Sequence, residues 1–323
     1  MIVQVPLDEK QENWLKNQGL LEPNEQILEY TKAGEGNMNV VIRVKTTLKS
    51  FILKQSRPFV NKYPQIPAPK ERILTERAFY KAIASDEILA SYSPKMIKFN
   101  EEFLVMVLDD LGNTADFTFI YREPPLFSSQ DAKSLISYLN NLHVLDPGDF
   151  PDNSDMKLLN HEHIFVFPYL EDNGFDLNQV QKGLQELALT YKKNKSLKKE
   201  IIALGERYLR KGTQLLHGDF YPGSWMKLSD GIKIIDSEFA FAGDREFDLA
   251  VMLAHLKLAK VSQLRINEIQ KMYQRNAQID QKLLDQYMGA EILRRLIGLA
   301  QLPLHLTLEE KQQLCEEATA MIL

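Results

Sequence analysis

Short apolar runs that suit β-strands dominate the first third of the chain. The runs VVIRV (40–44) and SFILK (50–54) are separated only by KTTLK, which favours two neighbouring antiparallel strands. The runs MIKF (96–99) and FLVMVL (103–108) predict a second hairpin, with a pair of glutamates in its turn. The pattern therefore predicts an antiparallel sheet near the N-terminus.

A helical pattern lies between these two hairpins. In ERILTERAFYKAIAS (71–85), Ile73 and Tyr80 lie on one helix face, and Glu76 falls on that same face. A carboxylate on the inward face needs an oppositely charged partner. Lys54, the last residue of the second predicted strand, is the natural candidate.

From about residue 114 onward the pattern becomes mainly helical. The predicted helices span 129–147, 176–211, 244–260, 263–298 and 308–322. The exception is 213–243, where WMKL (225–228) and IKII (232–235) flank a Ser-Asp-Gly turn and predict a hairpin.

Strands first and helices second predict an α+β protein of two lobes with a cleft between them. The predicted boundary gives a small β-rich N-terminal lobe over residues 1–110 and a larger, mainly helical lobe over residues 111–323.

Composition narrows the function classes. The chain has 323 residues, of which 44% are hydrophobic, and a net charge of −5, so bulk basicity does not point to nucleic acid. It has one cysteine, no signal-peptide pattern at its start and no apolar run of the roughly 20 residues that span a membrane. We expect a cytoplasmic monomer or homodimer that acts on a small molecule, with no nucleic-acid or membrane partner.

Acidic residues flank the predicted hairpin at 225–235. The stretch HGDFYPGS, which holds Asp219 and Ser224, precedes the first strand, and Asp236 and Glu238 follow the second. A hairpin returns the chain to its start, so these side chains are expected to converge. Clustered carboxylates repel one another and normally need a cation, and oxygen ligands suit Mg²⁺. The sequence therefore predicts a magnesium site here.

The first third of the chain supplies groups that suit a phosphate. Gly34, Gly36 and Asn37 precede the first strand and can form a tight loop whose N–H groups approach an anion. A strand lysine such as Lys54 can place a point charge on phosphates. Paired with Glu76, it would form the lysine–glutamate pair with which kinases hold the phosphates of ATP.

Together these motifs resemble the aminoglycoside phosphotransferase and choline kinase-like superfamily, whose members are relatives of the protein kinases. HGDFYPGS followed by IIDSEFAF carries the resemblance. Within the superfamily the chain is most similar to the 5-methylthioribose kinases, which share the loop GEGNMN, the strand ILKQSRPFV, a serine at the place of Ser224 and an Asp-x-Glu metal motif. The segment EILRRLIGLA, with Arg294 and Arg295, is similar to that family's arginine pair at the sugar site.

The resemblance implies a two-lobed protein-kinase-like fold and a role for each motif of the helical lobe. Asp219 would accept or orient the proton of the substrate hydroxyl that attacks the γ-phosphate of ATP. Asp236 would hold Mg²⁺, with help from Glu238 and Ser224.

Further roles follow from the same resemblance. In the N-terminal lobe, Lys54 would bind the α- and β-phosphates. The segment that contains Leu108, Asp109, Asp110 and Leu111 would contact adenine through backbone groups. In the helical lobe, His217 would hold the catalytic loop by hydrogen bonds, and Asp248 would anchor that loop from the following helix.

The implied function is an ATP-dependent kinase that phosphorylates a hydroxyl of a sugar-like acceptor. Two alternatives stay open, a fructosamine-, aminoglycoside- or choline-type kinase and an inactive nucleotide-binding module. AGDREFDLA (242–250) is similar to fructosamine kinases, and Ser224 is the one motif-level hint of inactivity. Taken alone, Arg294 and Arg295 suit a solvated helix face. Because adjacent helical residues point to different faces, we expect at most one of them to enter the cleft.

Overall fold

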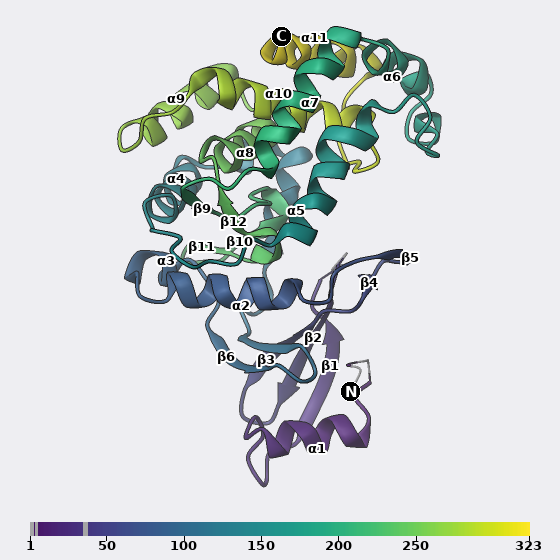
Figure 1. The fold of residues 1–323 in the computed structure, drawn as a ribbon. Coiled ribbons are helices and arrows are strands. Elements are labelled where there is room, and N and C mark those ends of the chain that lie inside the picture. The colour runs from purple at the N-terminus through teal and green to yellow at the C-terminus, as the bar shows by residue number, and fades with distance from the viewer. Residues whose placement is uncertain (1–2, 4–5, 35–37) are drawn as a thin grey trace. The chain divides into compact units, whose positions relative to one another are not determined.

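The computed structural model describes residues 3, 6–34 and 38–323. Their contacts divide the chain into two compact units, residues 1–114 and 115–323, whereas the sequence placed the boundary after residue 110. The first unit is built around a sheet and the second is mainly helical (Figure 1), which confirms the predicted α+β class.

The sheet of the first unit is antiparallel and has five strands in the order β1-β2-β3-β7-β6. Its strands are β1 (Ile27–Lys32), β2 (Val40–Thr46), β3 (Ser50–Gln55), β6 (Met96–Asn100) and β7 (Val105–Asp109). Both predicted hairpins are confirmed, because β2 pairs with β3 and β6 pairs with β7. Pairing of β3 with β7 joins the two hairpins into one sheet.

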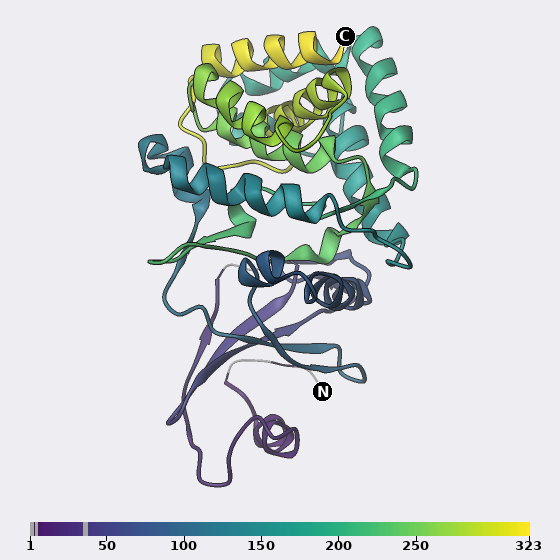
Figure 2. The same ribbon diagram turned by 90° about the vertical axis from the view of Figure 1, so that its left-hand side faces the viewer.

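Helices cover both faces of this sheet (Figure 2). Side chains alternate along each strand, so one face carries Ile42, Phe51 and Val107, which pack with Leu15 of helix α1 (Glu9–Asn17). The other face packs against the predicted stripe of helix α2 (Arg72–Ile83), including Ile73. The elements that complete the unit are β4 (Phe59–Val60), β5 (Tyr63–Pro67) and α3 (Glu87–Ser91).

The second unit consists of eight helices and five short strands within its residues, all of which the structure describes. The helices are α4 (Ser129–Leu142), α5 (Ser154–His161), α6 (Leu184–Lys192), α7 (Lys195–Leu209), α8 (Glu246–Leu258), α9 (Gln263–Gln274), α10 (Gln281–Ile297) and α11 (Leu308–Ile322). Helix α10 packs against both α8 and α11 and forms the centre of the helical core.

Two predicted helices are each broken into two, and the breaks have a local cause. Asn194 begins α7 by accepting a hydrogen bond from the Leu197 N–H, and Asp280 begins α10 in the same way through the Leu283 N–H. A capping residue starts a new helix. It therefore divides the predicted helix in two, even though the spacing of hydrophobic residues continues across it. Helices α1 and α5 were not predicted. No helix in the described part of the chain is both long enough and apolar enough to cross a bilayer.

The predicted β-rich stretch at 213–243 is confirmed. Strand β10 (Trp225–Lys227) pairs with β11 (Ile232–Ile234) in the expected hairpin, and β8 (Ala115–Asp116) adds to its edge. Strand β9 (Gln214–Leu216) pairs with β12 (Phe241–Gly243). Both β9 and β10 are partly or fully buried, so they form a fixed support for the loop between them.

Candidate active site

Lys54 and Glu76 form a buried ion pair in the first unit. Lys54 follows Ile52 on the side of β3 that faces α2, and Glu76 lies on the inward stripe of α2. The Lys54 Nζ is 2.8 Å from Glu76 Oε1 and 2.7 Å from Oε2, and the two residues are 5% and 1% exposed. The alternation of side chains along the strand and the helical repeat of α2 thus place the two residues opposite each other, which confirms the predicted pair.

Arg72, one turn before Glu76 on α2, was not predicted to matter, yet it is 1% exposed. Its Nε donates to Asn39 Oδ1 at 3.1 Å and its Nη2 to the Met38 carbonyl at 2.6 Å. Met38 and Asn39 lie directly between the predicted glycine loop and β2. The same helix therefore binds the residues that follow the glycine loop, through Arg72, and carries Glu76, the partner of Lys54.

The glycine loop itself is described only at its first residue. Gly34 has φ +89°, a left-handed conformation that glycine adopts without strain. Gly36 and Asn37 lie outside the described residues.

The predicted adenine-binding segment ends β7. Leu108 lies opposite Ile52 of β3, and the side chain of Asp109 accepts a hydrogen bond from the Lys95 N–H at 2.6 Å. Asp110 pairs with Arg43, Nε to Oδ2 2.9 Å. Both carboxylates therefore already have protein partners, which leaves the backbone as the part of this segment that could contact a ligand. Leu111, which follows, is partly buried.

In the second unit, a loop that begins at His217 leaves β9 and carries Asp219. Asp248, on α8 and fully buried, accepts two backbone hydrogen bonds from this loop, from the His217 N–H at 2.7 Å and the Gly218 N–H at 2.9 Å. Gly218 has φ +81°, and a Cβ there would lie 2.1 Å from the Phe239 carbonyl oxygen. The sequence HGD therefore forms this turn because only glycine fits its middle position.

His217 connects the loop to the residues after the hairpin. Its Nε2 lies 3.0 Å from the Ile235 carbonyl, so Nε2 carries the proton, and its Nδ1 accepts from the Asp219 N–H at 3.4 Å. The Ile235 N–H also donates to the Ser224 carbonyl at 3.0 Å. The two ends of the hairpin are thus brought together as the sequence predicts.

Burial raises the pKa of the Asp219 carboxyl to about 6, although the charges of Arg294 and Arg295 act to lower it. The negative charge of Asp236 also raises the pKa of Asp219. Asp236 itself has φ +70° and ψ 47°, a conformation that is uncommon outside glycine and is concentrated at functional sites. A cation held at Asp236 would relieve the repulsion between the two carboxylates.

The predicted group of three carboxylates is not found. No three Asp, Glu, His or Cys side chains are placed to hold a metal ion anywhere in residues 3, 6–34 and 38–323. The hydroxyl of Ser224 donates to the Asp219 carbonyl at 2.9 Å, and Glu238 is 1% exposed. Mg²⁺ usually takes one or two carboxylates and completes its shell with water and substrate phosphates. Asp236, beside a bound triphosphate, fits that requirement without a preformed cage.

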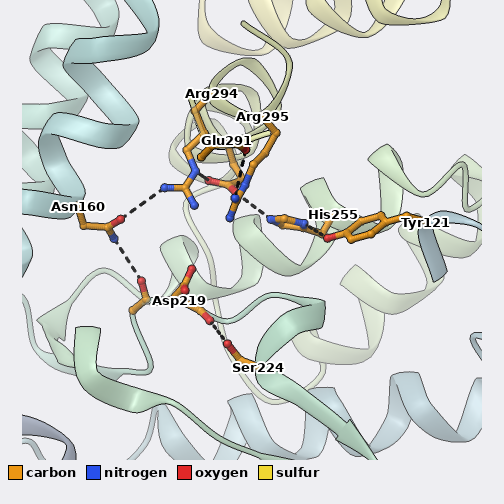
Figure 3. A network of polar contacts seen from close by, with 10 residues as sticks. Tyr121, Asn160, Asp219, Ser224, His255, Glu291, Arg294 and Arg295 are labelled. Atoms are coloured by element: carbon orange, nitrogen blue, oxygen red, sulfur yellow. Dashed lines mark hydrogen bonds and ion pairs between the residues drawn. The ribbon is translucent and has the colours of Figure 1, made fainter. Parts of the chain in front are cut away.

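Arg294 and Arg295 are both buried, at 6% and 7% exposed, so the predictions of a solvated face and of a single inward arginine are wrong. Both extend from α10 toward Asp219 (Figure 3). Glu291 explains this, because its Oε2 lies 2.6 Å from Arg294 Nε and its Oε1 lies 2.8 Å from Arg295 Nε. Long side chains three and four residues from one carboxylate can both turn to it.

Besides Glu291, sequence reasoning missed three residues that complete this network. His255 lies 2.8 Å from Glu291, Tyr121 contacts His255, and Asn160 bonds both Arg294 and the Gly218 carbonyl. Only Glu291 had a signal in the sequence, its spacing from the arginines. The other three come from separate elements and have no local motif.

Known proteins share sequence and fold with this chain. Residues 29–273 match the model of the phosphotransferase enzyme family. The methylthioribose kinase of Exiguobacterium sibiricum is 28% identical over 251 residues, which cover 70% of this chain and 60% of the relative. That of Yersinia pestis (strain Pestoides F) is 24% identical and covers 83% of this chain and 78% of its own. The chain thus spans less than two thirds of the length of the first of these relatives.

Solved structures share the fold. The choline kinase LicA from Streptococcus pneumoniae superposes with a TM-score of 0.56 at 14% identity and covers 98% of this chain and 99% of its own. Spectinomycin phosphotransferase APH(9)-Ia, in complex with ADP and spectinomycin, gives a TM-score of 0.53 at 14% identity, with 98% of each chain covered. These likenesses confirm the protein-kinase-like fold class that the motifs implied. With three quarters of its length matched by the family model, the chain belongs to the phosphotransferase enzyme family.

Proposed function

We propose that this protein is an ATP-dependent kinase that transfers the γ-phosphoryl group to a hydroxyl of a neutral, sugar-like acceptor of the methylthioribose type. The observation that carries the proposal is the placement of Asp219, in a loop anchored by Asp248, beside the buried arginine pair. The relatives named methylthioribose kinase support the same acceptor class.

Asp219 suits the role of the residue that accepts the hydroxyl proton. Its pKa of about 6 leaves it mostly ionised at neutral pH and still close enough to the working pH for efficient proton acceptance. The anchored backbone fixes its position before any ligand binds, which lowers the entropic cost of reaching the reactive geometry.

Nucleotide binding would use the first unit. The Lys54 ammonium, held by Glu76, suits the phosphates of ATP, and the backbone that follows β7 suits adenine. Asp236 would hold Mg²⁺, with Glu238 and Ser224 as further oxygen donors nearby in sequence. The metal would supply charge neutralisation on the transferring phosphoryl group.

The arginines favour one kind of acceptor over another. A guanidinium donates hydrogen bonds and accepts none, so Arg294 and Arg295 can pair with hydroxyl oxygens of a sugar. The ammonium groups of choline- or aminoglycoside-type acceptors also lack an acceptor atom, so they would face these arginines with like charge and no hydrogen bond. The like charge of the arginines therefore disfavours the choline- and aminoglycoside-type alternatives.

The test is one competition experiment. The purified protein, Mg²⁺ and ATP would be incubated with a pool of 5-methylthioribose, a fructosamine, choline and an aminoglycoside, and mass spectrometry would identify any phosphorylated product. We expect phosphorylated 5-methylthioribose, and none from Asp219→Ala. Asp155→Ala, which removes an exposed carboxylate on α5, serves as the matched control.

Other products would change the conclusion. Phosphorylated choline or aminoglycoside would refute the argument from the arginines, and phosphorylated fructosamine would reassign the acceptor. A product that Asp219→Ala forms equally well would refute the role of Asp219. Stabilisation by MgATP without any product would favour the inactive nucleotide-binding module.

A further inference from the structure

We propose that Glu291 is a positioning residue that orients Arg294 and Arg295 for the acceptor, and that His255 and Tyr121 hold Glu291 in place. The inference rests on the proposed kinase function. It assigns a role to three buried residues that do not themselves contact the reacting atoms.

The geometry of the two arginines carries the first step. Arg295 Nε donates a hydrogen bond to Glu291 Oε1 at 2.8 Å, and Arg294 Nε lies 2.6 Å from Glu291 Oε2 as an ion pair without hydrogen-bond geometry. In a planar guanidinium a contact at Nε restrains the direction of the whole fork, because its N–H groups have fixed relative directions. One carboxylate therefore restrains both guanidinium groups at once. Nη1 of Arg294 bonds Asn160 and Nη1 of Arg295 bonds the Ala300 carbonyl, so among the described residues the Nη2 groups are the ends left for a ligand.

Charge gives the second step. In the described part of the chain Glu291 is the only acidic partner within ion-pair distance of either arginine. The second balancing charge is that of Asp219, which acts on both arginines from farther away. Although burial raises the pKa of Glu291, the two arginines and a hydrogen bond from His255 hold that pKa well below its usual range. Glu291 therefore stays ionised.

His255 and Tyr121 provide the third step. A carboxylate only accepts hydrogen bonds, so His255 Nε2–H donates to Glu291 Oε1 at 2.8 Å, and His255 Nδ1 accepts from the Tyr121 hydroxyl at 2.5 Å. Burial lowers the pKa of His255 to about 4, so the ring stays neutral in this tautomer at neutral pH. The chain of donors is thus directed one way, from Tyr121 to Glu291 (Figure 3).

The oriented arginines are joined to the catalytic loop by two routes. The Arg295 guanidinium lies over the ring of Tyr221, 5.3 Å from its centroid. Arg294 Nη1 reaches Asn160 Oδ1 at 3.4 Å, and Asn160 Nδ2 reaches the Gly218 carbonyl at 3.4 Å. Displacing Glu291 would therefore misplace the acceptor relative to Asp219 rather than disturb the nucleotide.

The kinetic test compares Glu291→Gln with a matched control, Glu317→Gln, which breaks the pair between α11 and Lys257. The amide has nearly the size of the carboxylate, but its NH₂ group faces an arginine donor. We expect Glu291→Gln to raise the KM for the acceptor about tenfold or more, as the loss of one charge-assisted contact would. The KM for ATP should stay within about twofold, and Glu317→Gln should change neither value.

Tyr121→Phe removes only the hydroxyl at the far end of the chain of donors and keeps the ring. It should raise the acceptor KM by a smaller factor, about two- to fivefold, because Glu291 keeps its charge. The matched control is Tyr191→Phe, whose hydroxyl bonds the Gln312 carbonyl elsewhere in this unit. The proposal is overturned if Glu291→Gln leaves the acceptor KM unchanged, or if both KM values and kcat move together with the melting temperature.

A readout that needs no substrate separates this proposal from the proposed function. In protein labelled with ¹⁵N-arginine, the Nε–H signal of Arg295, which donates to Glu291, should exchange slowly with solvent. Glu291→Gln should abolish that protection, and Glu317→Gln should leave it intact. If the wild type phosphorylates no acceptor, the proposed function fails. If the Arg295 signal stays protected in Glu291→Gln, the positioning role fails, whatever the activity.

Discussion

Replacing Asp219 by asparagine should stabilise the protein at neutral pH while abolishing phosphoryl transfer. The wild-type carboxylate is ionised at pH 7 in a place where burial disfavours its charge. An amide of nearly the same shape carries no charge and cannot accept the proton of a substrate hydroxyl. The same property that suits Asp219 for catalysis therefore costs folding stability.

The size of the effect follows from the pKa of Asp219, raised from 3.8 to about 6 in the folded protein. A shift of about two units corresponds to roughly 3 kcal/mol of unfolding free energy. Because the folded protein binds this proton more tightly than the unfolded chain, the wild type loses that stability as the pH rises from about 4 to about 6. Asparagine does not titrate, so the advantage of Asp219→Asn should grow across this window and be complete at pH 7.

Thermal unfolding of both proteins between pH 4 and pH 8 tests the reasoning. For a unit of the size of residues 115–323, 3 kcal/mol corresponds to a rise of roughly 6–12 °C at pH 8. Asp155→Asn, at an exposed position on α5, measures how the general charge of the protein affects the curve. A difference between wild type and Asp219→Asn that does not change with pH would refute the argument, whatever its sign.

Three further outcomes follow from the anchoring contacts. Glu76→Gln should destabilise the first unit by about 3 kcal/mol, because it leaves the Lys54 charge buried, and should weaken ATP binding measured by calorimetry. An ATP affinity equal to that of the wild type would contradict the role of the pair. Gly218→Ala should lower the melting temperature and the activity together, since its Cβ would meet the Phe239 carbonyl; an unchanged protein would show that the loop can shift freely. Asp248→Asn should cost about 1–3 kcal/mol in denaturant unfolding, because its NH₂ group cannot accept from a loop N–H. No loss there would mean that the anchor is dispensable.

Local periodicity was enough to predict much of the first unit. The strand and helix patterns placed Lys54 and Glu76 on facing surfaces, because each period is fixed by backbone geometry within a few residues. The hairpin at 225–235 was predictable for the same reason. Arg72 was not, since its partners are backbone carbonyls and an amide, which leave no pattern of charges in the sequence.

In the second unit, local periodicity was not enough to predict the contacts around Glu291. The rule that neighbouring helical residues point apart misplaced Arg294 and Arg295, because it describes Cβ directions and their side chains are long enough to bend toward Glu291. His255 reaches that carboxylate from 36 residues away, and Tyr121 reaches His255 from 134 residues away. Their meeting depends on how helices pack, which no short stretch of sequence encodes.

The hydrogen bonds that anchor the catalytic loop do not involve its reactive side chain. Asp248 accepts hydrogen bonds from main-chain N–H groups, and the Ile235 carbonyl accepts one from the His217 ring. None of these contacts involves the side chain at position 219. The shape of the turn is therefore independent of the reactive group that it presents. A cysteine or histidine could be installed at this position on an unchanged backbone, which makes the loop a suitable starting point for engineering other group-transfer reactions.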